Sequence, residues 1–318
     1  INHFGSQGST GGPISLINIR FVESAALSAG GFGARYGDRT SSATTITLRE
    51  GNTERLAGEV NVAATQFGAV LEGPIGSKGS FFANVRQSYL DLLFKAIGLS
   101  FIPAYTDATA KAVWRPTSRD AFSVLTIAAR GTVSFDNSTD SARVNNSQVL
   151  APVQDQYFSG LTWKRLLPRG VVTTTLGRTW TRFVTAQRDS LLQPIFENRS
   201  TEGENSLRSD LTWVLRRGLE LEAGSQLRYA STLRYDATLA GFTRRDEGGV
   251  PQPLRVDTAF TAWRQANYAQ ASWQALPKLR VSGGLRSDWY GFLNNAWRLS
   301  PRGNVAYRAS ESTTLTLA

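Results

Sequence analysis

The clearest period-two alternation in the chain is Leu207-Arg208-Ser209-Asp210-Leu211-Thr212-Trp213-Val214-Leu215-Arg216. Its odd positions carry Leu, Ser, Leu, Trp and Leu, whereas its even positions carry Arg, Asp, Thr, Val and Arg. Successive side chains of a strand point to opposite faces, so this order predicts a strand with one apolar and one polar face. Leu279 to Tyr290 and Asp107 to Arg115 alternate in the same way.

The same unit recurs outward from this stretch, from about residue 56 to the end of the chain. Two segments of about ten alternating residues flank a short turn, and a long polar loop follows, which is the rhythm of a transmembrane barrel. The short turns, assigned to the periplasmic side, are 76–79, 116–120, 168–170, 217–218 and 277–278. The long loops, assigned to the cell exterior, are 91–105, 134–155, 185–204 and 236–258. About thirteen strands are expected.

One loop segment fits two structures. Residues 88–99 have an apolar spacing that suits a short amphipathic helix, and continuation of the strand is the alternative.

Composition excludes several classes of protein. No stretch approaches the run of about 18 apolar residues that a membrane-spanning helix needs, which excludes a helical membrane protein. A barrel remains open at a mean hydropathy of −0.24, because every second side chain faces a wet lumen. The net charge of +10 suggests nucleic acid, but the arginines are spread singly through the strands, so no nucleic-acid partner is expected.

Cysteine and methionine are both absent. The lack of cysteine removes disulfides and thiolate sites and suits export through an oxidising periplasm. The lack of an initiating methionine and of a signal peptide leads us to expect that the natural N-terminus lies upstream of Ile1. The expected fold is thus a partial antiparallel barrel, open in this fragment, with C-terminal strands missing as well.

Residues before the barrel have a different texture, rich in Gly and Ser. They hold, in order, Val22-Glu23-Ser24, Gly30-Gly31-Phe32, Tyr36-Gly37, Ser41-Ser42 and Thr44-Thr45-Ile46-Thr47-Leu48-Arg49-Glu50-Gly51. This order resembles the end of the plug of TonB-dependent outer-membrane receptors, although Arg35 and Ala43 depart from the usual residues. The likeness continues through Leu71 to Gly76 and Arg86 to Asp91, which resemble the first barrel hairpins of that family.

The resemblance implies a domain division and a function. Residues 1–52 would be the C-terminal part of the plug, and residues 53–318 the N-terminal part of a barrel of about 22 strands. The implied activity is TonB-dependent uptake of a scarce ligand, such as a ferric siderophore, cobalamin or an oligosaccharide, across the bacterial outer membrane. The implied partners are the TonB energy-coupling protein, whose contact site would lie upstream of Ile1, the outer-membrane lipid and a small extracellular ligand. A passive porin or structural barrel is the alternative.

Candidate chemical groups favour no enzyme and no cofactor. His3 is the sole histidine and is expected on the plug surface, so no Ser-His-Asp set can form within the strands. Gly31, Gly33 and Gly37 miss the dinucleotide spacing by one residue and suit tight turns better. Glu220 and Glu222 share a strand face and are expected to line the lumen beside Arg228. No catalytic or metal-binding residue is predicted, and the ligand-binding residues stay unknown.

The loop 134–155 contains side chains with oxygen atoms that could bind calcium. They are Asp136, Asn137, Ser138 and Asp140. The spacing lacks the remaining ligands of a calcium loop, so a solvated loop is favoured.

The pattern makes three structural predictions. The sheet should be open and curved, with the strand 313–317 unpaired along one side. Trp114, Trp163, Trp213 and Trp273 should face outward near the short turns, with Trp289 toward the opposite rim. Residues 1–51 should lie on the concave face, against Arg208, Asp210, Arg228 and Arg286.

Overall fold

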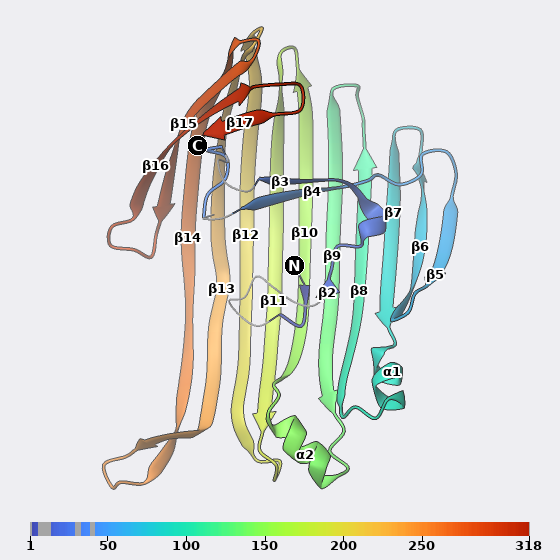
Figure 1. Ribbon diagram of the computed structural model, residues 1–318, viewed down its shortest axis with the longest axis vertical. Helices are drawn as coiled ribbons and strands as arrows, with labels where there is room; N and C mark the ends of the chain where they lie inside the picture. The colour runs from blue at the N-terminus through green and yellow to red at the C-terminus, as the bar shows by residue number, and fades with distance from the viewer. Residues whose placement is uncertain (1, 6–13, 29–32, 39–41, 318) are drawn as a thin grey trace.

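The computed structural model describes residues 2–5, 14–28, 33–38 and 42–317, with side chains at all of these except 241–244. Thirteen antiparallel strands form one curved sheet in chain order (Figure 1). They are β5 Ala57–Val62, β6 Gln66–Ile75, β7 Gly79–Ser88, β8 Phe101–Trp114, β9 Asp120–Phe135, β10 Ala151–Leu167, β11 Gly170–Arg188, β12 Pro194–Arg216, β13 Leu219–Arg245, β14 Pro251–Leu276, β15 Leu279–Tyr290, β16 Trp297–Arg308 and β17 Thr314–Leu317.

The sheet is open, as the sequence predicts. β5 and β17 are its two edges, and within the described residues each pairs with a single neighbour. The residues 313–317 therefore contribute an edge strand, also as predicted. All five predicted short turns are found between consecutive strands, and we call the edge of the sheet that they form the short-turn edge. The opposite end, where the longer connections lie, is the long-loop edge (Figure 1).

The long connections differ from the prediction in two ways. Two of them contain helices, α1 Leu90–Ala96 and α2 Asp140–Ser147, so residues 88–99 take the helical alternative. Neither helix is long and apolar enough to cross a membrane. The predicted loops 185–204 and 236–258 are wrong, because most of their residues extend β11 to β14. These extensions keep their ladder pairing, for example Val184 with Arg199, although they lack the apolar face on which the strand prediction depended.

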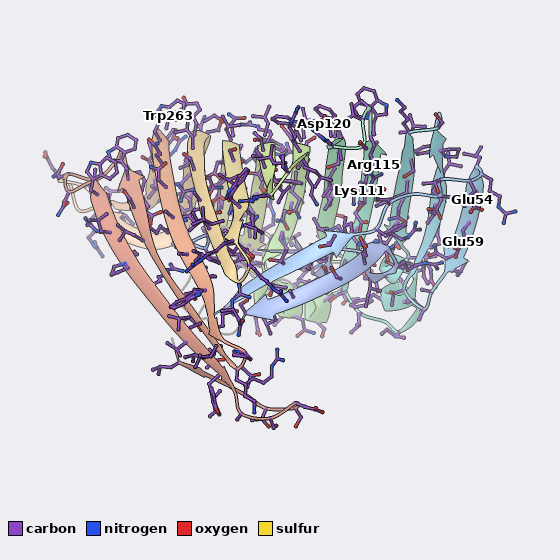
Figure 2. The ribbon with its side chains drawn as sticks, turned by 90° about the horizontal axis from the view of Figure 1, so that it is seen from above. Glu54, Glu59, Lys111, Arg115, Asp120 and Trp263 are labelled. Atoms are coloured by element: carbon purple, nitrogen blue, oxygen red, sulfur yellow. The ribbon has the colours of Figure 1, made fainter. Side chains whose placement is uncertain are left out.

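The residues before β5 form small elements on the concave face of the sheet (Figure 2). A short ladder joins β1 Asn2–His3 to β2 Ile14–Ser15, and a 3-10 turn, η1 Ile19–Phe21, leads into the hairpin of β3 Val22–Ser28 and β4 Ala43–Leu48. We call the described residues from 2 to 52 the N-terminal segment. Among the quoted motifs, 30–32 and Ser41 lie outside the described residues.

The strand register assigns every side chain to one of two faces. Trp114 pairs with Phe122, Phe122 with Trp163, and Trp163 with Thr174, so all four share a face. Thr174 pairs with Ser209, which places Trp213 on that face, and Leu219 carries the same face across to Trp273. This convex face points away from the N-terminal segment, so the outward orientation predicted for the four indoles is confirmed.

A second aromatic row lies on the same face toward the long-loop edge. Tyr157 stacks on Trp180 with ring centroids 5.8 Å apart, and Tyr229 stacks on Trp263 at 4.4 Å. Trp289 pairs with Trp297 at the far end of β15, as predicted. Trp263 and Trp273 are ten positions apart on β14. That separation matches the 9 to 11 or so residues of a tilted transmembrane strand, so Trp263 and Trp273 mark the borders of an apolar band on β14.

Candidate functional site at the concave face of the sheet

A buried charge network fastens the start of the N-terminal segment to β7 and β8. His3 Nε2 lies 3.0 Å from Asp107 Oδ2, and Arg86 Nε donates to Asp107 Oδ1 at 2.8 Å. Arg86 Nη2 also donates to the carbonyl oxygens of Ser15 at 3.0 Å and Leu16 at 3.3 Å. His3 is fully buried, so its predicted place on the plug surface is wrong. It is buried because Asp107 offers a carboxylate on the inward face.

The turn before β3 is held by an aromatic stack. Phe21 and Phe82 are parallel to within 9°, with ring centroids 4.4 Å apart, and both are almost completely buried. The Arg49 guanidinium lies over both rings, 5.0 Å from the Phe21 centroid, and its Nη1 donates to Glu72 Oε2 at 2.5 Å. Leu48 and Val70 complete this small apolar cluster. Apolar and charged contacts thus occur together, with the cation covering the ring pair.

The end of the segment is tied to the short-turn edge. Arg115 Nη1 donates to Glu50 Oε2 at 2.8 Å, and Lys111 Nζ donates to the carbonyl oxygen of Leu48. The hydrogen bond and charge of the Arg115 guanidinium lower the pKa of the Glu50 carboxyl below its ordinary 4.5, although partial burial acts in the opposite direction. Glu50 therefore stays ionised to a more acidic pH in the folded protein.

This pair predicts an acid-sensitive contact at residues 49–52. Because the pKa of Glu50 is lowered by folding, its stabilisation is complete above pH 4.5 and is lost as the pH falls through the folded value. Both side chains are partly exposed, so the loss should stay below about 1 kcal/mol. Protection factors at 49–52, which are corrected for the intrinsic exchange rate at each pH, should fall on acidification. Glu50→Gln should reduce that pH dependence, and the part that remains belongs to Glu72, which binds Arg49 and the Asn52 amide. Glu54→Gln is the matched control and should leave the full pH dependence intact.

Side chains of β14, β15 and β16 form hydrogen bonds with the backbone of residues 33–35. Gln270 Oε1 accepts from the Ala34 amide at 2.8 Å, and Arg302 Nη1 donates to the Gly33 carbonyl at 3.0 Å. Arg286 Nη1 donates to the carbonyls of Ala34 at 3.4 Å and Arg35 at 3.3 Å. A Cβ on Gly37 would lie 2.4 Å from the Arg286 guanidinium, so any larger residue at position 37 would displace that guanidinium. The contacts are polar and directional rather than apolar.

A second acidic centre lies on β12. Asp210 accepts from Arg208 Nε at 2.7 Å and Nη2 at 2.9 Å, and from the Tyr268 hydroxyl at 2.7 Å. Arg35 of the N-terminal segment adds a longer contact, with Nη2 at 3.4 Å from Oδ2. Asp210 is thus largely satisfied within the sheet, and its bond to Arg35 is the weaker one.

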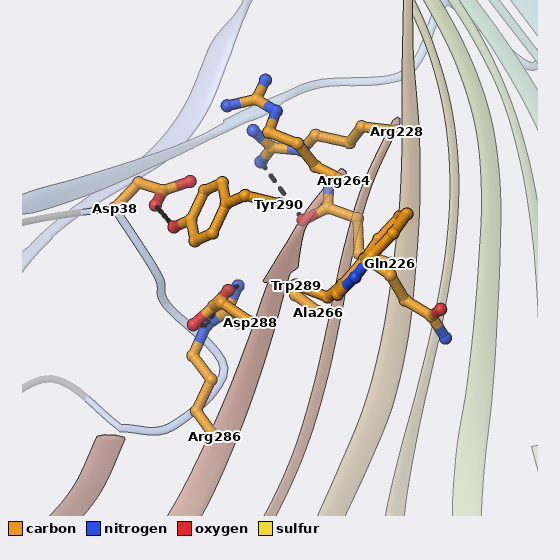
Figure 3. A pocket seen from close by; sticks show the side chains of 10 residues that line it. Asp38, Gln226, Arg228, Arg264, Ala266, Arg286, Asp288, Trp289 and Tyr290 are labelled. Atoms are coloured by element: carbon orange, nitrogen blue, oxygen red, sulfur yellow. Dashed lines mark hydrogen bonds and ion pairs between the residues drawn. The ribbon is translucent and has the colours of Figure 1, made fainter. Parts of the chain in front are cut away.

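A small pocket lies where residue 38 meets β13, β14 and β15 (Figure 3). The Tyr290 hydroxyl donates to Asp38 Oδ1 at 2.6 Å, which forms one wall from the N-terminal segment. Three arginines line the pocket from the sheet: Arg228, Arg264 and Arg286. Two of them face Glu204, since Arg264 forms an ion pair with it and Arg228 Nε lies 3.9 Å from its Oε1. Arg286 instead forms a two-pronged pair with Asp288.

A comparison with known families decides the identity. The family described as "TonB dependent receptor-like, beta-barrel" matches residues 84–318, which is most of the chain. The chain belongs to this family. Membership places the chain in the bacterial outer membrane. None of the curated proteins searched matches the sequence.

Solved structures of siderophore receptors and of an outer membrane transporter share the fold at low sequence identity. A mutant of the ferric enterobactin receptor PfeA from Pseudomonas aeruginosa is 15% identical, with a TM-score of 0.71 over 96% of this chain and 49% of that one. The siderophore receptor PirA from Acinetobacter baumannii is 14% identical, with 0.66 over 93% and 47%. The outer membrane transporter YddB from Escherichia coli is 10% identical, with 0.64 over 94% and 47%. The chain spans about half the length of these structures.

Of the four lumen residues that were predicted to contact the N-terminal segment, two do so. Asp210 and Arg286 contact it as predicted. Arg208 contacts Asp210 instead, and Arg228 faces Glu204. Glu220 and Glu222 share the concave face with Arg228, as their even positions predict, and Glu222 accepts from Gln270 at 3.2 Å.

The remaining candidates take structural places. Asp136 caps the Ser138 amide, Asn137 accepts from Asn146, and Asp140 pairs with Arg143. No group of three metal-ligating side chains occurs in the described part of the chain. Gly33 accepts a turn bond from the Tyr36 amide, whereas Gly31 lies outside the described residues.

Several interface residues were not predicted, and they are Arg86, Asp107, Gln270, Tyr290 and Arg302. Arg86 and Asp107 are directly paired across β7 and β8 on the inward face, so alternation alone could have identified this pair of opposite charges.

Proposed function

We propose that the protein is an energy-coupled receptor that takes up a scarce ligand across the outer membrane. Residues 1–52 are the end of its plug, and residues 53–318 begin its barrel. The short-turn edge faces the periplasm and the long-loop edge faces the cell exterior, where the ligand is captured. The TonB energy-coupling protein supplies the force that rearranges the plug.

The observation that carries this proposal is the way the N-terminal segment occupies the concave face. Its attachments run from side chains such as Arg86, Gln270, Arg286 and Arg302 to its backbone. In the described residues, apolar packing against the segment occurs in small clusters around Phe82 and Ile127 and where the rings of His3 and Phe4 contact Tyr105. Each polar contact can be exchanged for a contact with water, so its net contribution is about 1 kcal/mol when both partners are neutral and about 1.5 to 3 kcal/mol when a guanidinium donates. A segment that is held mainly by polar contacts can be moved by force, as a gated transporter requires.

A ferric siderophore is the ligand class that we place first. One of the similar structures is described as a ferric enterobactin receptor, and another, PirA, is described as a siderophore receptor. Cobalamin and oligosaccharides are the other candidates.

Uptake of radiolabelled ferric siderophore by cells that express the complete protein tests this proposal. Uptake should collapse when the coupling protein is deleted or the proton gradient is dissipated, while binding to the cell surface should persist. A passive porin is the alternative, and it would give uptake that needs no energy and rises in proportion to ligand concentration.

A further inference from the structure

The two edges of the sheet carry opposite charge. The five turns 76–78, 115–119, 168–169, 217–218 and 277–278 contain six basic residues and no carboxylate. The basic residues are Lys78, Arg115, Arg119, Arg169, Arg217 and Lys278. The connections at the long-loop edge, 63–65, 89–100, 136–150, 189–193, 246–250 and 291–296, contain six carboxylates and two basic residues. A sixth connection at the short-turn edge, 309–313, carries Glu311 and no basic residue. The connections of the short-turn edge therefore carry more positive charge than those of the long-loop edge.

Most of this positive charge is uncompensated within the molecule. Arg115 is paired with Glu50, but no ion pair of the other five is found among the described residues. Lys78 Nζ donates to the neutral carbonyl of Pro116 at 2.9 Å, and Arg169 Nη1 donates to that of Leu215 at 3.4 Å. All five side chains are exposed. Each can therefore reach an external anion.

The arrangement of these charges indicates the shape of their partner. Each of the five turns contributes at least one basic side chain, so the charges follow the arc of the edge instead of clustering on one sector. They also lie within a few residues of the outward indoles Trp114, Trp163, Trp213 and Trp273. Indoles prefer the border between lipid chains and headgroups. A charge just beyond that border is at the depth of lipid phosphates.

We propose that the short-turn edge docks the headgroups of anionic phospholipids in the leaflet that surrounds it. The leaflet runs along the whole edge of a barrel, and charges spread over five successive short turns match it, whereas a protein partner would contact one sector. This inference rests on the membrane placement proposed above, and it does not depend on energy-coupled uptake. Its role is to fix the height of the barrel in the membrane while the plug is pulled.

Quenching of tryptophan fluorescence by brominated lipids tests the proposal. The complete protein is reconstituted in phosphatidylcholine vesicles that contain brominated phosphatidylglycerol or brominated phosphatidylcholine. A basic residue near an anionic surface raises lipid affinity on the order of fivefold. Since one lipid meets one or two such residues, phosphatidylglycerol should be preferred about tenfold at low salt, and the preference should fall as salt is added.

Removal of the charges should abolish that preference. The variant combines Lys78→Gln, Arg119→Gln, Arg169→Gln, Arg217→Gln and Lys278→Gln, and a milder variant carries Lys78→Gln and Lys278→Gln alone. The milder variant should lose part of the preference, which keeps the test valid if the variant with all five substitutions folds poorly. Lys95→Gln with Arg143→Gln, at the long-loop edge, is the matched control and should change nothing.

Two outcomes would overturn the proposal. One is equal quenching by both lipids in the unaltered protein. The other is an unchanged preference in both variants. If soluble polyglutamate instead bound the detergent-solubilised protein through these residues, without any lipid preference, the edge would be a site for an acidic protein. Uptake is measured in a separate experiment. A failure of the transport proposal can therefore be distinguished from a failure of the lipid proposal.

Discussion

Asp107→Ala should release the start of the N-terminal segment from the sheet. The substitution leaves the buried Arg86 guanidinium without its carboxylate and leaves His3 Nε2 without a partner. Removing one member of a buried ion pair costs about 3 to 5 kcal/mol, because the remaining charge is uncompensated. Hydrogen exchange at residues 2–5 and 14–16 should accelerate by roughly two to three orders of magnitude, while the strands far from β8 keep their protection.

Asp155→Ala is the matched control for this change. Asp155 also pairs with two arginines, Arg130 and Arg182, but their side chains are 64% and 48% exposed on the convex face. Such pairs contribute about 0 to 1 kcal/mol, so exchange in the N-terminal segment should not change. Equal effects of the two substitutions would show that the buried network does not anchor the segment.

Phe82→Ala should free the hairpin of β3 and β4. Its ring stacks on Phe21 and contacts the cluster that includes Leu48, with about 1% of its surface exposed. Truncating a buried phenylalanine costs about 3 to 5 kcal/mol through lost packing and the cavity that remains. Urea titration followed by hydrogen exchange should show early opening of 21–28 and 42–48. The Arg49 guanidinium would lose one of its two rings at the same time.

The adjacent Phe81 provides the control for the second prediction. Its position on β7 directs it to the convex face, away from the N-terminal segment. Phe81→Ala should therefore alter contact with lipid or detergent and leave exchange in the β3–β4 hairpin unchanged. A comparable opening of the hairpin in both variants would contradict the role given to the Phe21–Phe82 stack.

The strands and their faces could be predicted from the sequence because period-two alternation determines both. The outward indoles and the inward Asp210 and Arg286 follow directly from their positions. The prediction of loops failed where the alternation of apolar and polar residues ends but the hydrogen-bonded pairing of the strands continues, as in the extensions of β12, β13 and β14. Beyond the apolar band both faces meet water, so no apolar side is required and a strand has the composition of a loop.

The candidate site was harder to predict because it joins parts of the chain that are far apart in sequence. His3 meets Asp107 across 104 positions, and Arg302 reaches Gly33 across 269. The pattern within each strand carries no information on how the N-terminal segment is placed along the sheet. The inward Arg86 and Asp107 could be identified as a pair, but not the histidine that completes their network.

The central claim is that the N-terminal segment must move for transport, and a reversible tether tests it most directly. Residues 1–318 contain no cysteine, so an introduced pair has no competing thiol within this part of the protein. A Cβ on Gly284 would lie 3.1 Å from the Ala34 Cβ, inside the spacing of about 3.5 to 4.5 Å in a disulfide, and 2.9 Å from the Ala269 carbonyl oxygen, so a small backbone shift must accompany the disulfide. Cells that express the complete protein with Ala34→Cys and Gly284→Cys should bind ferric siderophore but take up none when oxidised. A thiol reductant should restore uptake, and each single variant should transport throughout. Undiminished uptake by a protein whose disulfide is shown to be complete would contradict the account.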